Sequence, residues 1–367
     1  MSEIFPKIQI NLDAVKQNAK VVCDLCAKFG INVAGVIKFS DGDVRAAKAY
    51  LDGGCAQVAV SRAVHLKALK EAFPEKETLL TRSPMRWEIE NVARYADFSL
   101  HSDADSLRAL NDEAKKAGTK PKIILMLDVG DLREGVESID ELVLLALMVE
   151  NELKNLYLSG IGTNHACLNG VLPNSENLAF LVEGAKAVEK AIGRKLDIIS
   201  GGSSVNLMLL KDGTNPMPPE INHLRIGGII ANPINMRLIR DLTFEGFRED
   251  SVRILAEIVE IHEKESSPKN SSGLNWSGEK IVRENKGRRM RAILAIGSQD
   301  IATPMALMPE DEKIEIIGAS SDHTIIDVTD SKKKWQSGDI VTFKTRYQPM
   351  LHSFTGQHVK KEYIYDR

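Results

Sequence analysis

The sequence has few cysteines, no long hydrophobic run and no excess of either charge. Four cysteines, Cys23, Cys26, Cys55 and Cys167, are too few and too scattered for a disulfide framework in a chain of 367 residues. Cys23 and Cys26 form a C-x-x-C pair, but the second pair that a structural zinc site requires is missing. We therefore expect reduced thiols and no metal site.

Further absences narrow the function. The start, Met-Ser-Glu-Ile-Phe-Pro-Lys, lacks the basic and apolar parts of a secretory signal, and no window of about 18 apolar residues follows. The 48 lysines and arginines nearly balance 51 aspartates and glutamates, which leaves no basic face for nucleic acid or an anionic membrane. The composition therefore predicts a globular, cytoplasmic protein that acts on a small molecule.

Eight short apolar runs alternate with helix-like stretches in the first part of the chain. They cover 31–37, 57–60, 78–81, 97–100, 123–128, 157–161, 196–199 and 223–226. Alternating strands and helices indicate right-handed parallel βαβ units, and continuous apolarity indicates strands covered on both faces. Eight such units favour a TIM (β/α)8 barrel over an open doubly wound sheet, because no G-x-G-x-x-G follows the first run.

Beyond residue 240 the pattern changes to β-rich runs without long helices between them. These runs are 251–262, 291–297, 313–318, 324–328 and 339–345, with a polar loop expected over 263–287. We therefore predict an α/β barrel over 10–240 and a smaller all-β C-terminal domain over 241–367. Residues 1–9 are expected to pack on the second domain.

The active site of a barrel lies at the carboxyl ends of its strands, so the residues after each run are the candidates. Lys38 closes the first strand, where its amine would point into the barrel mouth, a position suited to Schiff-base chemistry. Arg133, bracketed by Gly130 and Gly135, could bind an oxyanion. Asn164 could bind a ring oxygen or form a simple Asx turn.

Two glycine-rich turns follow the seventh and eighth runs. The first, Ser200-Gly-Gly-Ser-Ser204, is expected to open a helix whose backbone N–H groups and hydroxyls cradle a phosphate. The second, Arg225-Ile-Gly-Gly228, presents further bare amides, and barrels often hold phosphate at this place. Together with the amine of Lys38, the turns predict a phosphate-bearing aldehyde, pyridoxal 5'-phosphate.

Several motifs together have the pattern of a known family. They are Ile8-Gln-Ile-Asn-Leu-Asp-Ala-Val15, Val36-Ile-Lys38, Arg82-Ser-Pro-Met85, Gly-Asp-Leu-Arg-Glu-Gly at 130–135, Gly-Ile-Gly-Thr-Asn at 160–164, Ser-Gly-Gly-Ser-Ser at 200–204, Asn-His-Leu-Arg-Ile-Gly at 222–227 and Gly-Ala-Ser-Ser-Asp-His at 318–323. The chain resembles the alanine-racemase-like, fold-type III pyridoxal phosphate enzymes over nearly its whole length. Within them it is most similar to the branch of ornithine racemase and other amino-acid racemases.

The resemblance implies an amino-acid racemase with pyridoxal phosphate as its cofactor. Lys38 would carry the cofactor as a Schiff base and serve as one proton-transfer base. Arg225 would face the pyridine nitrogen and keep it unprotonated, while Arg133 would reach the ring oxygen or the substrate carboxylate. The cofactor would further contact Asn164 and, through its phosphate, a small-residue set: Gly202, Ser203, Ser204 and Gly227.

The resemblance also implies a homodimer in which the β domain of one subunit completes the active site of its partner. Asp322 would come from across the interface, as a base or to orient one, and the adjacent Ser321 would contact the substrate. Tyr347 and His358 are rival proton donors on the substrate side. Family members carry a tyrosine base in the β domain, whereas residues 272–277 contain no tyrosine.

Two other functions use the same features. A fold-type III lyase or aldolase would share the barrel and the cofactor, although all cysteines precede residue 168, away from the late histidine and cysteine pair of the metal-assisted members. A non-catalytic pyridoxal phosphate-binding protein would be a single barrel, and the second domain argues against it. For a racemase, ornithine, lysine, arginine, serine and alanine all remain open as substrates.

Overall fold

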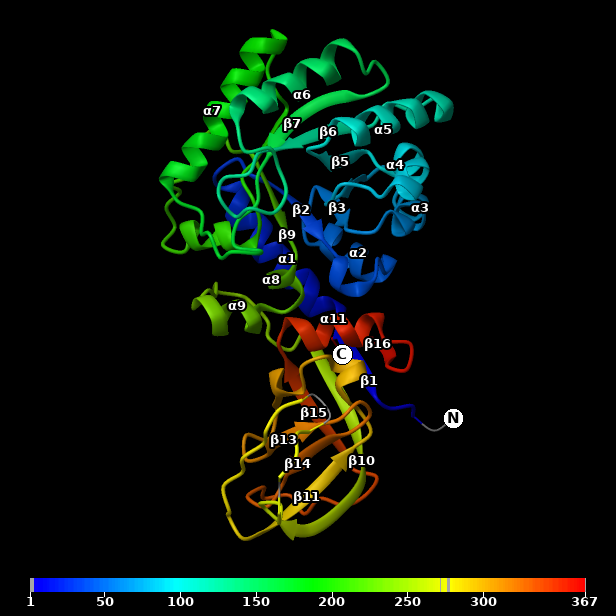
Figure 1. Cartoon of the computed structure of the whole chain (residues 1–367), viewed down its shortest axis with the longest axis vertical. Coiled ribbons are helices and arrows are strands. Elements are labelled where there is room, and N and C mark those ends of the chain that lie inside the picture. Colours follow the sequence, from blue (N-terminus) through cyan, green and yellow to red (C-terminus); the bar gives the residue numbers. More distant parts are fainter. Residues whose placement is uncertain (1–2, 271, 276–277, 367) are drawn as a thin grey trace. The chain divides into compact units, whose positions relative to one another are not determined.

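The computed structural model describes residues 3–270, 272–275 and 278–366, so Trp276 and Ser277 of the stretch 272–277 lie outside it. The chain forms two compact units (Figure 1). The barrel unit is Leu12–Arg248, and the β unit joins Met1–Asn11 to Glu249–Arg367. The barrel unit thus runs to 248 rather than 240. The N-terminal segment belongs to the β unit because strand β1 (Lys7–Asn11) pairs there with two other strands.

Eight parallel strands close the barrel, as the apolar runs predict, and each predicted run overlaps one of them. They are β2 (Asn32–Val36), β3 (Gln57–Val60), β4 (Glu77–Leu80), β5 (Phe98–His101), β6 (Lys122–Met126), β7 (Tyr157–Gly162), β8 (Ile198–Ser200) and β9 (His223–Ile226). Strand β9 pairs with β2, with Arg225 opposite Ala34, and this pairing closes the ring.

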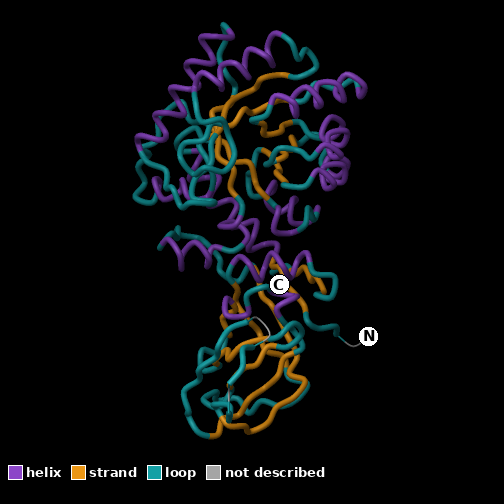
Figure 2. The backbone as a smooth tube through the Cα atoms, viewed as in Figure 1, coloured by secondary structure: helices purple, strands orange, loops and turns teal. Residues whose placement is uncertain are grey.

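Helices surround the barrel strands (Figure 2). They are α1 (Leu12–Ala27), α2 (Val44–Asp52), α3 (Leu66–Ala72), α4 (Ile89–Tyr95), α5 (Ala104–Ala117), α6 (Ile139–Asn151), α7 (Ser175–Ile192), α8 (Gly228–Ala231) and α9 (Pro233–Arg240), with 3-10 turns η1 (Lys38–Ser40), η2 (Ala63–His65), η3 (Arg86–Glu88) and η4 (Ser204–Leu210). Side chains such as Asp103 and Asn174 cap the first turns of α5 and α7. Among the described helices, none has the length and apolarity needed to cross a membrane.

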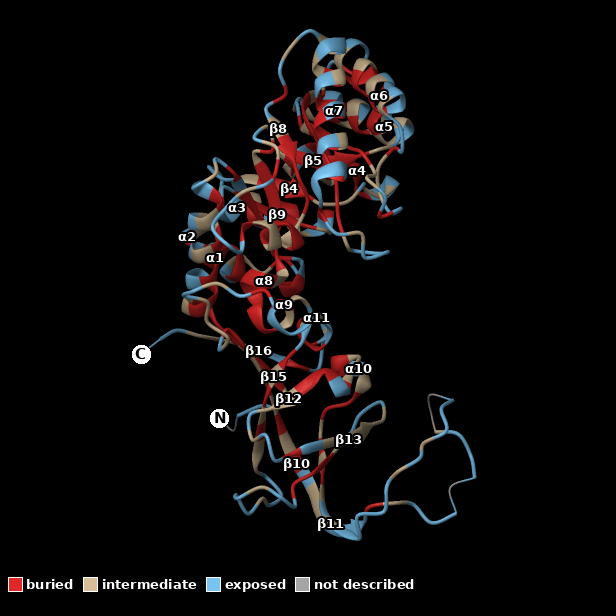
Figure 3. Cartoon of the chain, turned by 90° about the vertical axis from the view of Figure 1, so that its left-hand side faces the viewer, coloured by how far each residue is buried: buried red, intermediate tan, exposed pale blue. Residues whose placement is uncertain are grey.

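The inside of the barrel is mainly apolar, and the strands are buried (Figure 3). Alternate strand residues pack there: Ala34, Val36, Ala59, Leu79, Phe98, Leu100, Ile124 and Met126. Residues that pair directly on neighbouring strands point to the same side of the sheet. Gln57 and Arg225 both pair with Ala34, and Glu77 pairs with Gln57, so the barrel also encloses polar side chains.

The β unit contains an eight-stranded sheet built on the long strand β10 (Val252–Glu265). The other strands are β1, β11 (Arg288–Leu294), β12 (Leu307–Pro309), β13 (Glu315–Ala319), β14 (Thr324–Asp327), β15 (Ile340–Thr345) and β16 (Lys360–Ile364). Short helices α10 (Ser298–Ile301), η5 (Pro304–Ala306) and α11 (Tyr347–Thr355) join them. The sequence predicts the second, β-rich domain but not α11, whose nine residues include a proline.

Candidate active site

The ends of β2 and β9 bring Lys38 next to the second glycine-rich turn. Lys38 begins η1, two residues after β2, and Gly227 directly follows β9. A Cβ atom on Gly227 would lie 2.6 Å from the Val36 carbonyl oxygen, so only glycine allows this approach. The Lys38 side chain is exposed, and its amine has no ion pair or hydrogen bond with any described residue. This amine is therefore available for reaction.

Arg225 holds a positive charge inside the barrel. The residue is 6% exposed, its Nη1 donates to Ser200 Oγ at 2.5 Å, and its Nη2 donates to the Thr163 carbonyl at 2.5 Å. Burial lowers the pKa of Arg225 to about 10, so the guanidinium remains charged at neutral pH. Because both acceptors are neutral, this cation is fixed in place without being neutralised.

A buried hydroxyl lies next to this guanidinium. Thr163 is fully buried, and its Oγ1 has no hydrogen-bond partner among the described residues, although its carbonyl accepts from Arg225. Buried polar atoms are almost always hydrogen-bonded, so such an atom marks a place where a bound group would supply the partner. Thr163 follows the end of strand β7, directly before Asn164, and was not among the predicted site residues.

The first glycine-rich turn is tighter than the sequence suggests. Gly202 has φ +132, and a Cβ there would lie 2.4 Å from Asn206 Oδ1 and 2.8 Å from His165 Nδ1. The turn leads into η4, a 3-10 helix of seven residues, and the Ser203 N–H donates to Asn206 Oδ1 at 3.0 Å. The Ser203 N–H group is therefore already used within the turn and is not free, unlike the expectation for this one amide.

Arg133 and Asn164 come together at the rim. With its amide oriented so that the oxygen faces the arginine, Asn164 accepts a hydrogen bond from Arg133 Nη2 at 3.0 Å. Arg133 also forms an ion pair with Glu134. Partial burial lowers the pKa of Arg133, but the Glu134 carboxylate outweighs this and raises it overall. Glu134 competes with any anion that would bind Arg133.

Asp131 ties the two rim loops together. It is 2% exposed, and its carboxylate accepts hydrogen bonds from the backbone N–H groups of the next loop, at Cys167, Leu168, Asn169 and Val171. Burial raises the pKa of Asp131, but these N–H donors outweigh it and hold the pKa below its ordinary value. The loop that follows Asn164 is thus held by a carboxylate that was not among the predicted site residues.

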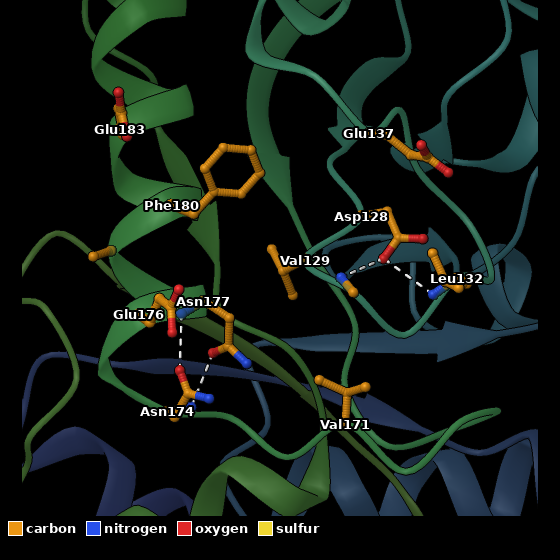
Figure 4. Close-up of a pocket in the computed structure, with 12 residues that line it drawn as sticks. Asp128, Val129, Leu132, Glu137, Val171, Asn174, Glu176, Asn177, Phe180 and Glu183 are labelled. Carbon is orange, nitrogen blue, oxygen red and sulfur yellow. Dashed lines mark hydrogen bonds between the residues drawn. The ribbon is translucent and has the colours of Figure 1, made fainter.

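A cavity of about 710 Å³ lies beside the Arg133 loop (Figure 4). It is lined by residues of the 128–137 loop and by Asn174–Glu183 at the start of α7, and it combines acidic and apolar side chains: Asp128, Glu137, Glu176 and Glu183 with Val129, Leu132, Val171 and Phe180. None of the predicted site residues lines it. The cluster of Lys38, Arg225 and the two turns is therefore separate from this cavity.

Four predicted site residues lie in the β unit. Ser321 and Asp322 form an exposed turn between β13 and β14, where Ser321 Oγ donates to Asp322 Oδ2 at 2.7 Å and Gln299 Nε2 donates to Asp322 Oδ1. Tyr347 begins α11, and His358 is exposed before β16. These residues thus belong to a different unit from Lys38 and Arg225.

Comparison of the sequence with known proteins identifies a matching family. The model of the alanine racemase N-terminal domain matches residues 10–231. The ornithine racemase of Acetoanaerobium sticklandii is 37% identical over 372 residues, covering 98% of this chain and 100% of that protein. The lysine racemase of Thermotoga maritima is 33% identical, covering 98% and 99%.

A solved structure shares the fold. The alanine racemase of Bartonella henselae with covalently bound pyridoxal phosphate is 18% identical, with a TM-score of 0.70 over 99% of this chain and 100% of that one. Both the barrel and the antiparallel β unit are therefore features of this fold. Because the family model covers more than half of the sequence and both sequence relatives match it almost end to end, the chain belongs to the alanine racemase family and is an amino-acid racemase.

Proposed function

We propose that this racemase binds pyridoxal 5'-phosphate at the mouth of the barrel unit and interconverts the L and D forms of an amino acid with a terminal ammonium group, ornithine or lysine. The buried guanidinium of Arg225, paired only with neutral acceptors among the described residues and close to the strand end that carries Lys38, is the main observation behind the cofactor assignment. The relatives support the substrate class, since they are named for ornithine and lysine.

The residues at the mouth fit this cofactor. The Thr163 hydroxyl, which has no partner among the described residues, would gain one, and no described residue forms an ion pair with the Lys38 amine. Gly227 lacks a side chain where one would collide with the backbone of β2. We assign covalent attachment to Lys38, the ring nitrogen to Arg225, the ring oxygen to Arg133 and Asn164, and the phosphate to a group of small residues: Gly202, Ser203, Ser204 and Gly227.

When bound, pyridoxal phosphate acidifies the α-hydrogen of an attached amino acid, which is the chemistry that racemisation needs. Lys38 Nζ would remove and return this proton on one face of Cα. Arg225 keeps its own proton and would not transfer it to the ring nitrogen, so it would limit how far negative charge spreads into the ring. Proton return to Cα would thereby compete well with side reactions.

Racemisation also needs a proton donor on the other face, because Lys38 serves only one. We assign this role to the β unit, with Asp322, Tyr347 and His358 as candidates. Both oxygens of the Asp322 carboxylate accept hydrogen bonds, from Gln299 and Ser321. This arrangement fits a group that orients a neighbour or substrate better than a freely moving base.

We propose that the β unit acts on the partner's barrel in a homodimer. The barrel rim supports a contact surface, because Leu132 and Leu168 are each 63% exposed and Leu172 is 37% exposed on loops that Asp131 holds together. The second subunit would cover these leucines and exclude water from the mouth. All four cysteines are free, which suits the reducing cytoplasm, where we propose that the enzyme acts.

The test is to incubate the purified holoenzyme with single L-amino acids in deuterated water and to follow the α-proton signal by NMR. Exchange with inversion, fastest for ornithine or lysine, would support the proposal. Exchange without inversion would show that the second proton donor is missing. Absence of exchange with every amino acid would refute the proposed activity.

A further inference from the structure

A chain of hydrogen bonds crosses the barrel interior, starting at Arg225. Its Nη1 donates to Ser200 Oγ, which lies 2.8 Å from His223 Nδ1. His223 Nε2 lies 3.2 Å from Gln57 Oε1, and Gln57 Nε2 donates to Glu77 Oε2 at 3.0 Å. Ser200 ends its strand, whereas His223, Gln57 and Glu77 begin theirs, so the chain runs from the mouth to the amino-terminal end of the barrel.

The far end of this chain fixes the direction of every bond. Glu77 Oε1 accepts from Lys122 Nζ at 2.7 Å, and a carboxylate can only accept. Gln57 must therefore turn its NH₂ group toward Glu77 and its oxygen toward His223. The imidazole must then carry its proton on Nε2, which leaves Nδ1 as an acceptor for the Ser200 hydroxyl.

The near end is compatible with this direction. The Arg225 guanidinium can only donate, so the Ser200 oxygen accepts from it, and the Ser200 hydrogen is left for the acceptor Nδ1 of His223. Burial and the Arg225 charge lower the pKa of His223 to about 3, so the imidazole is neutral at physiological pH. The middle of the chain is buried, with Ser200 0%, His223 3% and Gln57 4% exposed, and Gln57 and His223 border a cavity of about 310 Å³. Each group thus has one role and one orientation.

We propose that His223, held in its Nε2–H form by Gln57, is a positioning residue for Arg225. The neutral imidazole keeps the Ser200 hydroxyl turned so that its lone pair meets the guanidinium, which fixes the plane of Arg225 at the mouth. The inference rests on the proposed function for the role of Arg225 at the cofactor ring. The tautomer of His223 itself depends only on the barrel interior.

The first test determines the tautomer of His223 in the wild-type protein, and a variant serves only to assign the NMR signal. In the holoenzyme with ¹⁵N-labelled histidine, long-range ¹H–¹⁵N spectra distinguish the two tautomers, and His223→Gln identifies the signal. We expect a single Nε2–H form at neutral pH. An Nδ1–H form or a charged imidazole would overturn the proposal. This readout remains valid even if the protein racemises no amino acid, so the two failures can be told apart.

The second test is Gln57→Met, which keeps the side-chain shape but removes the acceptor of His223. We expect loss of the single tautomer, a shifted absorption maximum of the bound cofactor, and a kcat lower by roughly tenfold with KM little changed. The matched control is Ser99→Ala. It removes Ser99 Oγ, 2.9 Å from Nε2 of His101, another buried histidine, whose pKa burial lowers to about 4.

His101 has no link to Arg225 through the described hydrogen bonds, so Ser99→Ala should leave kcat and the cofactor absorbance unchanged. Equal losses in both variants would mean that any buried defect in the barrel has this effect, and would overturn the positioning role. An unchanged tautomer and kcat in Gln57→Met would do the same.

Discussion

The carboxylate of Asp131 is predicted to hold the β7–α7 loop in place. Its Oδ2 accepts the N–H groups of Cys167 and Leu168 at 3.0 Å, and its Oδ1 accepts that of Asn169 at 3.0 Å. Asp131→Asn keeps the shape but replaces one acceptor oxygen with an NH₂ group. Whichever way the new amide turns, at least one backbone N–H in this loop then faces a donor.

The structure gives a magnitude for this loss. With an NH₂ group in the place of Oδ2, two backbone N–H groups would lose their hydrogen bonds to a charged acceptor, each worth about 1.5–3 kcal/mol. Leu168 and Asn169 are exposed, so water can replace part of the loss, and we take the lower limit of about 3 kcal/mol. Native-state hydrogen exchange should then show amide protection at 167–169 falling by roughly a hundredfold.

Asp128→Asn is the matched control. Oδ1 of Asp128 alone accepts from Gly130 and Leu132, so an amide oxygen in the same place can keep both bonds. Protection at 167–169 should change little in this variant. A loss below about tenfold in Asp131→Asn, or an equal loss in both variants, would refute the role assigned to Asp131.

The pH dependence gives an independent check on Asp131. Its pKa is lowered in the folded state, so its contribution to stability is present above the ordinary pKa of an aspartate and is lost as the pH falls through the lowered value. Loop protection, corrected for intrinsic exchange, should be constant from neutral pH to about pH 5 and fall below about pH 4 in the wild type. Asp131→Asn should lack this fall.

Three further predictions concern the active site. Lys38→Ala should lose the absorbance of covalently bound cofactor and the mass increment left by borohydride reduction; retention of both would remove Lys38 as the attachment point. Arg225→Glu should allow the ring nitrogen to be protonated, so that a long-wavelength absorption band appears with substrate; a strong band of this kind in the wild type would contradict the Arg225 assignment. Mixing inactive Lys38→Ala and Asp322→Ala subunits should restore activity at the one mouth that inherits both wild-type residues; no recovery despite confirmed subunit exchange would show that these residues do not meet across a dimer.

The barrel strands were predictable because a parallel strand covered on both faces leaves an uninterrupted apolar run, and such runs as 57–60 and 223–226 match strands directly. The pairing of β1 with β16, the first and last strands of the chain, could not be predicted in this way. Lys7 and Glu362 form an ion pair across the whole length of the sequence, and no local pattern indicates such a pairing. Helix α11 was missed because its buried residues, such as Met350 and Phe354, lie on a short segment that contains Pro349.

Within the site, the residues after each strand could be found because a barrel places its chemistry there, and this led to Lys38, Arg133 and Arg225. The contacts that set the charge and orientation of these residues could not be found from the sequence. That Arg225 faces a neutral hydroxyl and a carbonyl follows from the neighbouring ends of β7 and β8. Likewise, the Ser203 N–H group, expected to be free, donates to the side chain of Asn206, three residues along.

The amino-terminal ends of the strands also carry informative residues, which a search restricted to the carboxyl ends does not include. Gln57, Glu77, Lys122 and His223 are polar residues at the first positions of barrel strands, an arrangement usually assigned to stability alone. As an ion pair, Glu77 and Lys122 contribute little to stability, because both side chains are about 40% exposed. Their effect lies instead in orientation, since a permanent acceptor at one end of the barrel determines, through Gln57 and a neutral imidazole, how the guanidinium at the other end is held.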